Sequence, residues 1–287
     1  MIDIMQTYSD FCQNKGIPFS LDSKITSYDD TTLFCPAGMQ QFKKQFKDRD
    51  INGKTIANIQ SCLRLLDLDS VGDGSHFLYF NMIGLFSFRQ MNVYQAIKFW
   101  IEFLFEIGVT PDYVSVHLDK YEEWKKWHEM IHNIPVRMDS ECVWSDGELS
   151  GYCTEFYVNN SKFKNLEIGN IVNICGDCID VGFGLERLHM VVNGQQIKTD
   201  VELLEESIQK ILDCGVVPSN KLQGYVLRRL MRLLWKKGGY IGSAYFKIER
   251  ERQENLIQKY LKLKDRYTDK SKEWWFGTHG IDIDLVE

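Results

Sequence analysis

The stretch from Asp180 to Arg187, which reads Asp-Val-Gly-Phe-Gly-Leu-Glu-Arg, holds the residues with the clearest chemical potential. Gly182 and Gly184 let a backbone approach a ligand where a side chain would block it. Arg187 falls on the first turn of a helix predicted over 185–192, so its guanidinium and the helix start can bind an anion together. Asp180 is then left to hold a cationic group such as an α-amine. The pattern predicts an anion site with an acidic neighbour.

Two further features extend this site toward a nucleotide. Arg64 ends a strand predicted over 57–64, and the aromatic-rich segment 77–88 is predicted to pair with it antiparallel. Attack of a substrate carboxylate on an α-phosphate develops charge that Arg64 can stabilise, while Arg187 holds the departing pyrophosphate. An aromatic ring can lie under the adenine. Orientation and electrostatics are enough for this reaction, and no side chain has to act as a nucleophile.

Two short motifs point to metal or redox chemistry, and their surroundings argue against it. His128-Glu-Met-Ile-His132 has the spacing of a zinc hydrolase, but the helix ends before Pro135 and no third histidine follows within reach. We expect a solvated surface pair there. Cys175-Gly-Asp-Cys178 has no second cysteine pair and falls within a segment predicted to be an apolar strand, which favours buried inert thiols. We therefore expect no zinc held by protein ligands.

Composition limits the partners and the location. A formal net charge of −6 over 287 residues disfavours general attraction to DNA or RNA, so a polyanion has to bind at a local basic face. Eight cysteines in a chain long enough to fold without disulfides are typical of a reducing compartment. The start carries no basic leader, and no apolar run reaches the roughly 20 residues that span a bilayer. We expect a soluble, cytoplasmic protein without a membrane partner.

Hydrophobic periodicity predicts an α+β fold in two parts. Mostly antiparallel strands come first, and the apolar segment 93–107 is too long for a strand and is predicted to be a helix buried across the sheet. Thr199 and Glu202 form a capping box that opens a wholly helical part. We expect a sheet domain over 1–193 and a helical domain over 194–287. Further strands are predicted over 31–39, 114–118, 143–144, 152–157 and 166–179, and further helices before Gly16 and over 40–47 and 120–132.

A helix predicted over 225–237 separates apolar from basic residues. Its basic side carries Arg228, Arg229, Arg232 and Lys236. Such a face on an acidic protein suits the phosphate backbone of a nucleic acid. A solvated face paired with the acidic helix over 202–206 is the alternative.

Five segments, taken in order, resemble the catalytic module of alanyl-tRNA synthetase, a class II aminoacyl-tRNA synthetase. They cover 32–43, 60–64, 80–88, 179–187 and 217–229, with shorter echoes at 153–155, 170–172 and 280–286. The segments keep the family order over nearly the whole chain. Since the chain stops at residue 287, the resemblance implies a stand-alone, truncated module without the editing and C-terminal domains of the family.

The resemblance also implies an activity and its residues. It implies an antiparallel class II sheet of six to seven strands flanked by helices, ATP and Mg²⁺ as cofactors, and alanine or a similarly small amino acid as substrate. Arg64 and Arg187 would be catalytic, bound to the α-phosphate and the γ-phosphate of ATP. The remaining implied residues are Phe80, Met82 and Gly184 for ATP, then Trp144, Asn170, Val172, Asp180 and Gly182 for the amino acid, and Asn220, Arg228, Arg229, Arg232 and Lys236 for the tRNA acceptor.

Departures from the family pattern bear on the acceptor. The connection over 65–69 is short and lacks the family's Gly-Gly-Lys. Asn81 stands where the family has Glu, Ser75 where it has Arg, and Gly169 where it has Trp. The resemblance implies that the chain forms an aminoacyl adenylate, and tRNA is the favoured acceptor because the basic helix is kept. A ligase that charges a carrier-protein thiol or a small amine, and a non-catalytic synthetase-like regulator, stay open as alternatives.

Overall fold

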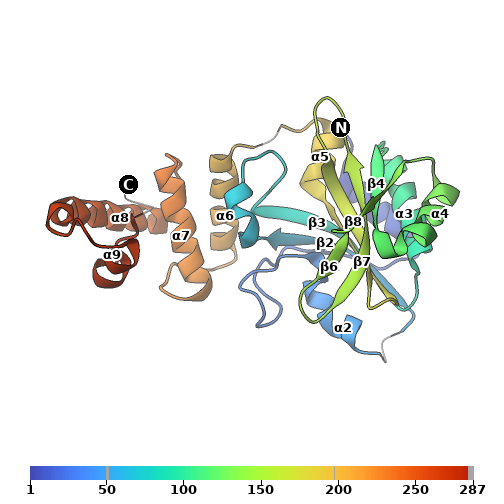
Figure 1. The fold of residues 1–287 in the computed structure, drawn as a ribbon, viewed down its shortest axis with the longest axis horizontal. Helices are drawn as coiled ribbons and strands as arrows, with labels where there is room; N and C mark the ends of the chain where they lie inside the picture. The colour runs from blue at the N-terminus through green and yellow to red at the C-terminus, as the bar shows by residue number, and fades with distance from the viewer. Residues whose placement is uncertain (50–51, 197, 284–287) are drawn as a thin grey trace. The chain divides into compact units, whose positions relative to one another are not determined.

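In the computed structural model, which describes residues 1–49, 52–196 and 198–283, the chain divides into two compact units. One comprises Met1–Asp69 and Asp73–Ile197, and the other comprises Ser70–Gly72 and Lys198–Glu287. The first unit contains a sheet with its flanking helices, and the second contains helices only (Figure 1).

The sheet of the first unit contains nine strands among the described residues, in the order β1-β2-β3-β9-β8-β7-β4-β5, with β6 beside β7. The strands are β1 (Phe19–Asp22), β2 (Lys54–Leu63), β3 (Tyr79–Phe88), β4 (Tyr113–His117), β5 (Val136–Asp139), β6 (Val143–Ser145), β7 (Ser150–Val158), β8 (Leu166–Ile174) and β9 (Cys178–Gly184). The helices of this unit are α1 (Ile4–Asn14), α2 (Lys43–Lys47), α3 (Val93–Glu106), α4 (Tyr121–Ile131) and α5 (Leu185–Asn193).

The expected antiparallel sheet is confirmed for its six central strands, from β2 through β3, β9, β8 and β7 to β4. Each edge adds a parallel pair, β1 with β2 and β4 with β5, so the complete sheet is mixed. Strand β1 was not predicted, because its four residues are too few to show a clear period of two.

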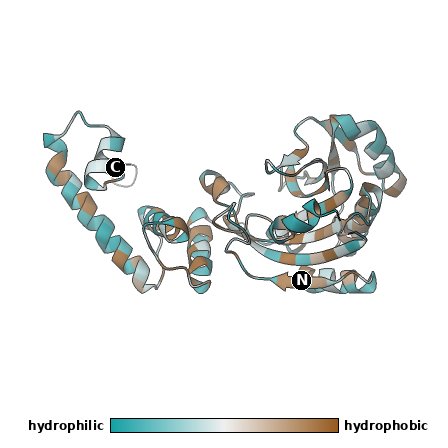
Figure 2. Ribbon diagram, turned by 90° about the horizontal axis from the view of Figure 1, so that it is seen from below, coloured by the Kyte–Doolittle hydropathy of each residue, from teal (hydrophilic) through white to brown (hydrophobic). Residues whose placement is uncertain are grey.

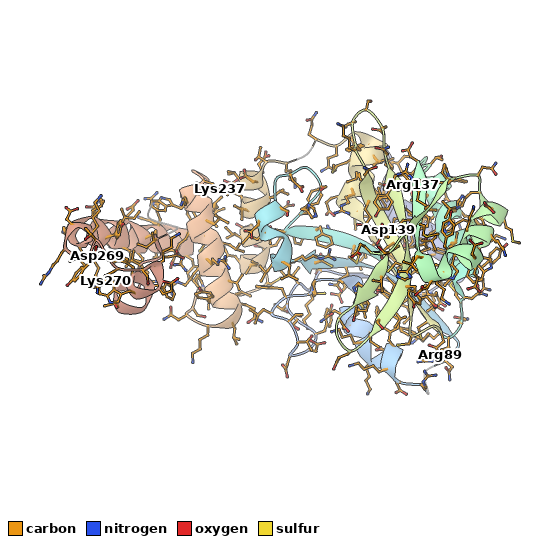
Figure 3. All side chains as sticks on the ribbon, in the orientation of Figure 1. Arg89, Arg137, Asp139, Lys237, Asp269 and Lys270 are labelled. Carbon is orange, nitrogen blue, oxygen red and sulfur yellow. The ribbon has the colours of Figure 1, made fainter. Side chains whose placement is uncertain are left out.

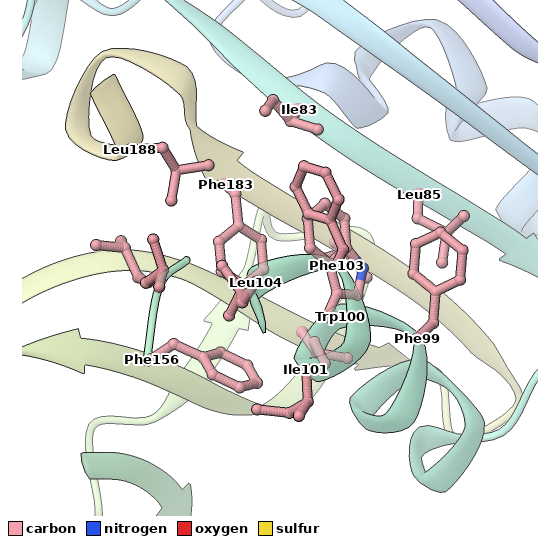
Figure 4. Close-up of a cluster of buried hydrophobic side chains, with 14 of the residues drawn as sticks. Ile83, Leu85, Phe99, Trp100, Ile101, Phe103, Leu104, Phe156, Phe183 and Leu188 are labelled. Carbon is pink, nitrogen blue, oxygen red and sulfur yellow. The ribbon is translucent and has the colours of Figure 1, made fainter. Parts of the chain in front are cut away.

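One face of the sheet carries the main hydrophobic core. Helix α3 lies against this face, and Trp100 and Phe103 from α3 are buried together with Phe183 from β9 (Figure 4). The rings of Trp100 and Phe183 stack with centroids 4.3 Å apart and planes 9° apart. The predicted helix over 93–107 is therefore confirmed, and a capping box formed by Asn92 and Gln95 starts it.

The opposite face is termed here the open face, because the helices of the main core do not pack on it. Its alternate residues include Phe86, Val172 and Cys178, which form a smaller apolar cluster with Phe42 and Phe46. Those two rings come from a 3₁₀ turn over Gly38–Phe42 and from α2, which cover one part of this face. The rest of the face carries polar side chains.

Two predicted strands differ from the structure. Residues 31–39 are not a strand; Phe34 forms one isolated bridge with Thr26, and the Pro36–Gly38 break leads directly into the 3₁₀ turn. The segment 166–179 is a hairpin rather than a single strand, because β8 turns back into β9 through Cys175 and Gly176, which have φ of 52° and 82°. Consequently the expectation of two buried thiols in this pair was wrong for Cys175, which is exposed, while Cys178 is buried.

The second unit is helical, as predicted. Its helices are α6 (Asp200–Asp213), α7 (Leu222–Lys236), α8 (Ala244–Leu263) and α9 (Lys272–His279). Thr199 and Glu202 form the expected capping box at the start of α6. The longest helix, α8, mixes hydrophilic and hydrophobic residues along its length (Figure 2), and no helix within the described residues combines the length and apolarity needed to cross a membrane.

Candidate active site

A row of aligned residues runs across the open face. Cross-strand pairing brings Gly84, Gly182, Asn170, Glu155 and Ser115 into register on five neighbouring strands. The row continues to Asn58 on β2 and to Arg137 on β5, the latter shown with Asp139 in Figure 3. The sheet pairing therefore gathers polar groups that lie up to 112 positions apart in the sequence, from Asn58 to Asn170. Neighbouring side chains pack over the two glycines, Phe86 and Asn58 over Gly84 and Met82 over Gly182.

Asp180 is the most perturbed carboxyl group on the open face. It alternates with the core residues Ile179 and Val181, so its side chain points to the opposite face from them. Burial raises the pKa of Asp180 to about 7. No described residue forms a hydrogen bond or an ion pair with its carboxylate. A desolvated carboxylate without a partner is suited to a cationic ligand, because an opposite charge would restore its ordinary pKa.

Next to Asp180 lie the other residues predicted for the amino-acid pocket. Asp180 pairs with Val172 across the strands, and Gly182 pairs with Asn170. A Cβ added at Gly182 would lie 2.8 Å from Met82 Sδ, so the thioether of Met82 packs over this glycine. Trp144 packs at the edge of the apolar cluster that contains Val172. The structure thus brings the five predicted amino-acid residues to one face.

Gly169 lies on the other face of β8. A Cβ at this position would fall 2.3 Å from the ring of Phe183, inside the main core. The absence of a large side chain at 169 therefore leaves the pocket on the open face unchanged, since Phe183 already fills the corresponding space.

Arg64 and Phe80, predicted to bind ATP, meet at the end of the β2 and β3 pair. The guanidinium carbon of Arg64 lies 5.0 Å from the centroid of the Phe80 ring. Its Nε and Nη2 donate to the carbonyl oxygen of Pro36, at 3.2 and 3.1 Å. A triphosphate would offer this guanidinium stronger, charged acceptors than that carbonyl.

Arg187 is held by three oxygen atoms at the start of α5. Its Nε donates to the Ser75 carbonyl at 3.0 Å, and its Nη1 donates to the Glu167 carbonyl at 2.7 Å and lies 3.4 Å from a Glu167 carboxylate oxygen. The neighbouring Glu186 accepts bonds from the backbone and side-chain amides of Asn81, at 2.9 to 3.0 Å. Gly184, which precedes the helix, pairs with Met82. These contacts fix the strand-to-helix turn that Asp180 to Arg187 predicted.

The chemically interesting residue that sequence analysis did not single out is Glu155. It is half-buried on β7, directly opposite Asn170, and burial raises its pKa. The hydroxyl of Tyr157 donates to Glu155 Oε2 at 2.5 Å, and Ser115 Oγ donates to the same oxygen at 3.3 Å. The sequence signal for Glu155 is the short family resemblance at 153–155, which does not indicate what the carboxylate contacts.

The histidine pair is buried, so the expectation of a solvated surface pair was wrong. His132 Nδ1 accepts from the Ile134 amide at 3.0 Å, which leaves its Nε2 to donate to His128 Nδ1 at 2.8 Å. His128 Nε2 then donates to Thr154 Oγ1 at 2.9 Å. Both nitrogen lone pairs are therefore occupied, and no group of three or more potential metal ligands occurs within the described parts of the chain. Burial lowers the pKa of His128 to about 3 and that of His132 to about 4.

The residues predicted for the acceptor face lie in the second unit, mainly on α7. Arg228 and Arg232 are not a solvated face; both approach the buried carboxylate of Glu249 on α8, at 2.9 and 3.5 Å. Arg252 lies 3.0 Å from the same carboxylate. Arg228 also donates to Asn220 Oδ1. The alternative prediction, that this face pairs with the acidic helix over 202–206, was wrong for Arg228 and Arg232. Both side chains contact Glu249 on α8 instead.

Two other predicted acceptor residues, Arg229 and Lys236, are exposed to solvent. The three arginines around Glu249 carry three positive charges against its one negative charge. The cluster therefore has a net charge of +2. The surface of α7 therefore stays basic even though two of its arginines are partly buried.

Comparisons with known proteins identify the family of the chain. The family model of class II (A) tRNA synthetases matches residues 3–205. The alanine–tRNA ligase of Buchnera aphidicola subsp. Schizaphis graminum (strain Sg) is 30% identical over 319 residues, covering 84% of this chain and 36% of the ligase. The alanine–tRNA ligase of Psychromonas ingrahamii is 28% identical over 352 residues, covering 96% of this chain and 39% of the ligase.

The chain thus spans less than half the length of the curated relatives it matches. Among solved structures, the RNA binding domain of threonyl-tRNA synthetase from Cryptosporidium parvum Iowa II matches with a TM-score of 0.43 and 10% identity, covering 87% of this chain and 78% of that one.

Acid should destabilise the fold through the histidine pair. Above its ordinary pKa of about 6.5, His128 is neutral in the folded and the unfolded chain. As the pH falls below that value, His128 binds a proton in the unfolded chain but stays neutral in the folded chain. The free energy of unfolding therefore decreases. At pH 5 this costs about 2 kcal/mol for His128. Urea unfolding at pH 7 and pH 5 measures the difference.

The variant His128→Asn should flatten that pH dependence, whatever its effect on stability at pH 7. The matched control His279→Asn, in the second unit, should leave the slope as in the wild type. An equal slope in wild type and His128→Asn would contradict the assignment.

Proposed function

The chain belongs to the class II (A) family of tRNA synthetases, and from this premise we propose that it is an adenylate-forming ligase that activates alanine, or a similarly small amino acid, with ATP and Mg²⁺ and transfers it to tRNA. The observation that carries the proposal is the unpartnered carboxylate of Asp180 on the open face, beside Gly182 and Asn170. Its match to the α-ammonium of an amino acid is chemical, because burial without a counter-charge favours a cationic ligand.

The residues divide the reaction between them. Asp180 would hold the α-ammonium, and Trp144, Asn170 and Val172 would enclose a small side chain. A carboxylate oxygen of the amino acid attacks the α-phosphorus of ATP, and the bond to the bridging oxygen of pyrophosphate breaks. Arg64 would stabilise the charge that develops on the α-phosphate. Mg²⁺ would neutralise the departing phosphates.

The nucleotide side of the site fits the same proposal. Phe80 would stack on the adenine, with Met82 and Gly184 beside it, and Arg187 would hold the γ-phosphate. The carbonyl oxygens that now accept from Arg64 and Arg187 are neutral, so a triphosphate can displace them. All eight cysteines are free, which supports a reducing compartment such as the cytoplasm.

For the acceptor we propose tRNA, bound by the basic surface of the second unit. Asn220 and the arginines of α7 would contact it, with Arg229 and Lys236 exposed and Arg228 held toward Asn220. The alanine–tRNA ligases similar to this chain support the same acceptor.

Amino-acid-dependent exchange of labelled pyrophosphate into ATP tests the activation step. The wild type should exchange with alanine, and Arg187→Ala should lose at least about a hundredfold in rate, because the departing pyrophosphate loses its charged partner. The control Arg266→Ala removes an exposed arginine from the second unit and should exchange normally. Exchange by a folded Arg187→Ala at the wild-type rate would remove this residue from the site. A wild type without exchange for any of the twenty amino acids would refute the proposed function.

The pH dependence of exchange tests Asp180. Only the ionised carboxylate attracts an ammonium group, so the KM for alanine should rise as the pH falls below about 7, approaching tenfold per pH unit. Asp180→Asn should give a high KM that does not change with pH. A wild-type KM that stays constant between pH 5.5 and 8 would contradict the assignment of the ammonium to Asp180.

Charging of total tRNA tests the acceptor surface. The double variant Arg229→Ala, Lys236→Ala should reduce aminoacylation about tenfold and weaken its dependence on salt, since two exposed cations are lost. Pyrophosphate exchange should stay unchanged. The control Lys247→Ala, Lys262→Ala removes two exposed lysines from α8. Equal charging by both double variants would exclude this part of α7, and exchange without any transfer by the wild type would point to another acceptor, such as a carrier protein.

A further inference from the structure

Glu155 lies one strand further from Asp180 than Asn170 does. It is the direct cross-strand partner of Asn170 on the open face, and Gly182 is the partner of Asn170 on the other side. Asn170 therefore stands between a carboxylate and a position with no side chain. The flexible thioether of Met82 lies over this glycine, so a ligand that binds there has to displace that side chain.

The two oxygen atoms of Glu155 have different surroundings. Oε2 accepts from the hydroxyls of Tyr157 and Ser115, at 2.5 and 3.3 Å, which fixes the plane of the carboxylate. Oε1 has no hydrogen-bond partner among the described residues. The side-chain amide of Asn170 likewise forms no hydrogen bond with any described residue. A half-buried acceptor and an unused donor thus belong to two residues that are directly paired between β7 and β8.

An asparagine amide can point either end toward a neighbour, and the surrounding charges decide which. A fixed carboxylate attracts the NH₂ end, because the carbonyl end would be repelled. With the NH₂ of Asn170 turned to Glu155, its carbonyl oxygen turns toward Gly182. That oxygen then joins the carboxylate of Asp180, two residues along β9, in facing the same space.

We propose that Glu155 is a positioning residue for the amino-acid substrate, which acts by orienting the amide of Asn170. The proposal rests on the proposed function, and it deepens the account of how the α-ammonium is recognised. Asp180 supplies the charge, and the carbonyl oxygen of Asn170 supplies a second acceptor in a fixed direction. Glu155 itself touches no substrate atom.

A double-mutant cycle on pyrophosphate exchange tests this mechanism. Glu155→Ala should raise the KM for alanine about tenfold, with the KM for ATP unchanged, because only the amino-acid contact loses its orientation. Asn170→Ala should raise the KM for alanine at least as much. The double variant should be no worse than Asn170→Ala alone, since Glu155 acts only through Asn170. If the two effects multiply instead, the proposal is overturned.

Matched variants separate positioning from stability. Tyr157→Phe removes a hydroxyl that fixes Glu155 and should raise the KM for alanine by a smaller factor, so the mechanism stays testable if Glu155→Ala folds poorly. Glu141→Ala removes an exposed carboxylate near β6 and should change nothing. A Tyr157→Phe variant with the wild-type KM for alanine would overturn the proposal.

The failure of the proposed function can be distinguished from failure of this inference. If the wild type exchanges with no amino acid, the same cycle is measured as calorimetric binding of alanine without ATP. Tenfold weaker binding by Glu155→Ala, lost in the Asn170→Ala background, would still support the positioning role. No binding of alanine by the wild type would overturn both.

Discussion

The open face depends on one unfavourable feature, a carboxylate that the fold desolvates without supplying a counter-charge. Raising the pKa of Asp180 from its ordinary value to about 7 costs the ionised protein on the order of 4 kcal/mol. The main core on the other face, where Trp100 stacks on Phe183, offsets this cost. A cationic ligand would recover it on binding. The site thus keeps its electrostatic attraction for an ammonium group by leaving its own carboxylate unpaired.

The antiparallel sheet fixes the positions of the residues around Asp180 relative to one another. Cross-strand pairing fixes the distance between neighbours, so Gly182, Asn170 and Glu155 stand in one row whatever their separation in sequence. Rigid strands hold such groups more accurately than loops do. The arginines differ in this respect, because Arg64 and Arg187 lie at element ends and bind carbonyl oxygens of loop or strand-end residues. In the proposed reaction, their contacts would have to rearrange before a triphosphate could bind.

In the second unit, charged side chains stabilise the packing of the helices, in addition to the binding of tRNA that we propose for them. The carboxylate of Glu249 is buried, and it is matched by Arg228, Arg232 and Arg252. Removing Arg228 or Arg232 would leave a buried charge with fewer partners, so such variants disturb the fold of α7 and α8 together with any RNA contact.

The sequence by itself determined the elements with strong local signals and the residues that the family motifs carry. The buried helix α3, the β2 and β3 pair, the capping box of α6 and the turn after Asp180 could all be predicted, because each depends on neighbours within a few positions. Tertiary structure alone decided which groups meet. It placed Glu155 beside Asn170, Gly169 under Phe183 and Glu249 between the arginines, and it buried His128 against Thr154. These contacts join residues that are as far as 26 positions apart, as His128 and Thr154 are. They depend on strand register and helix packing, which local sequence patterns do not specify.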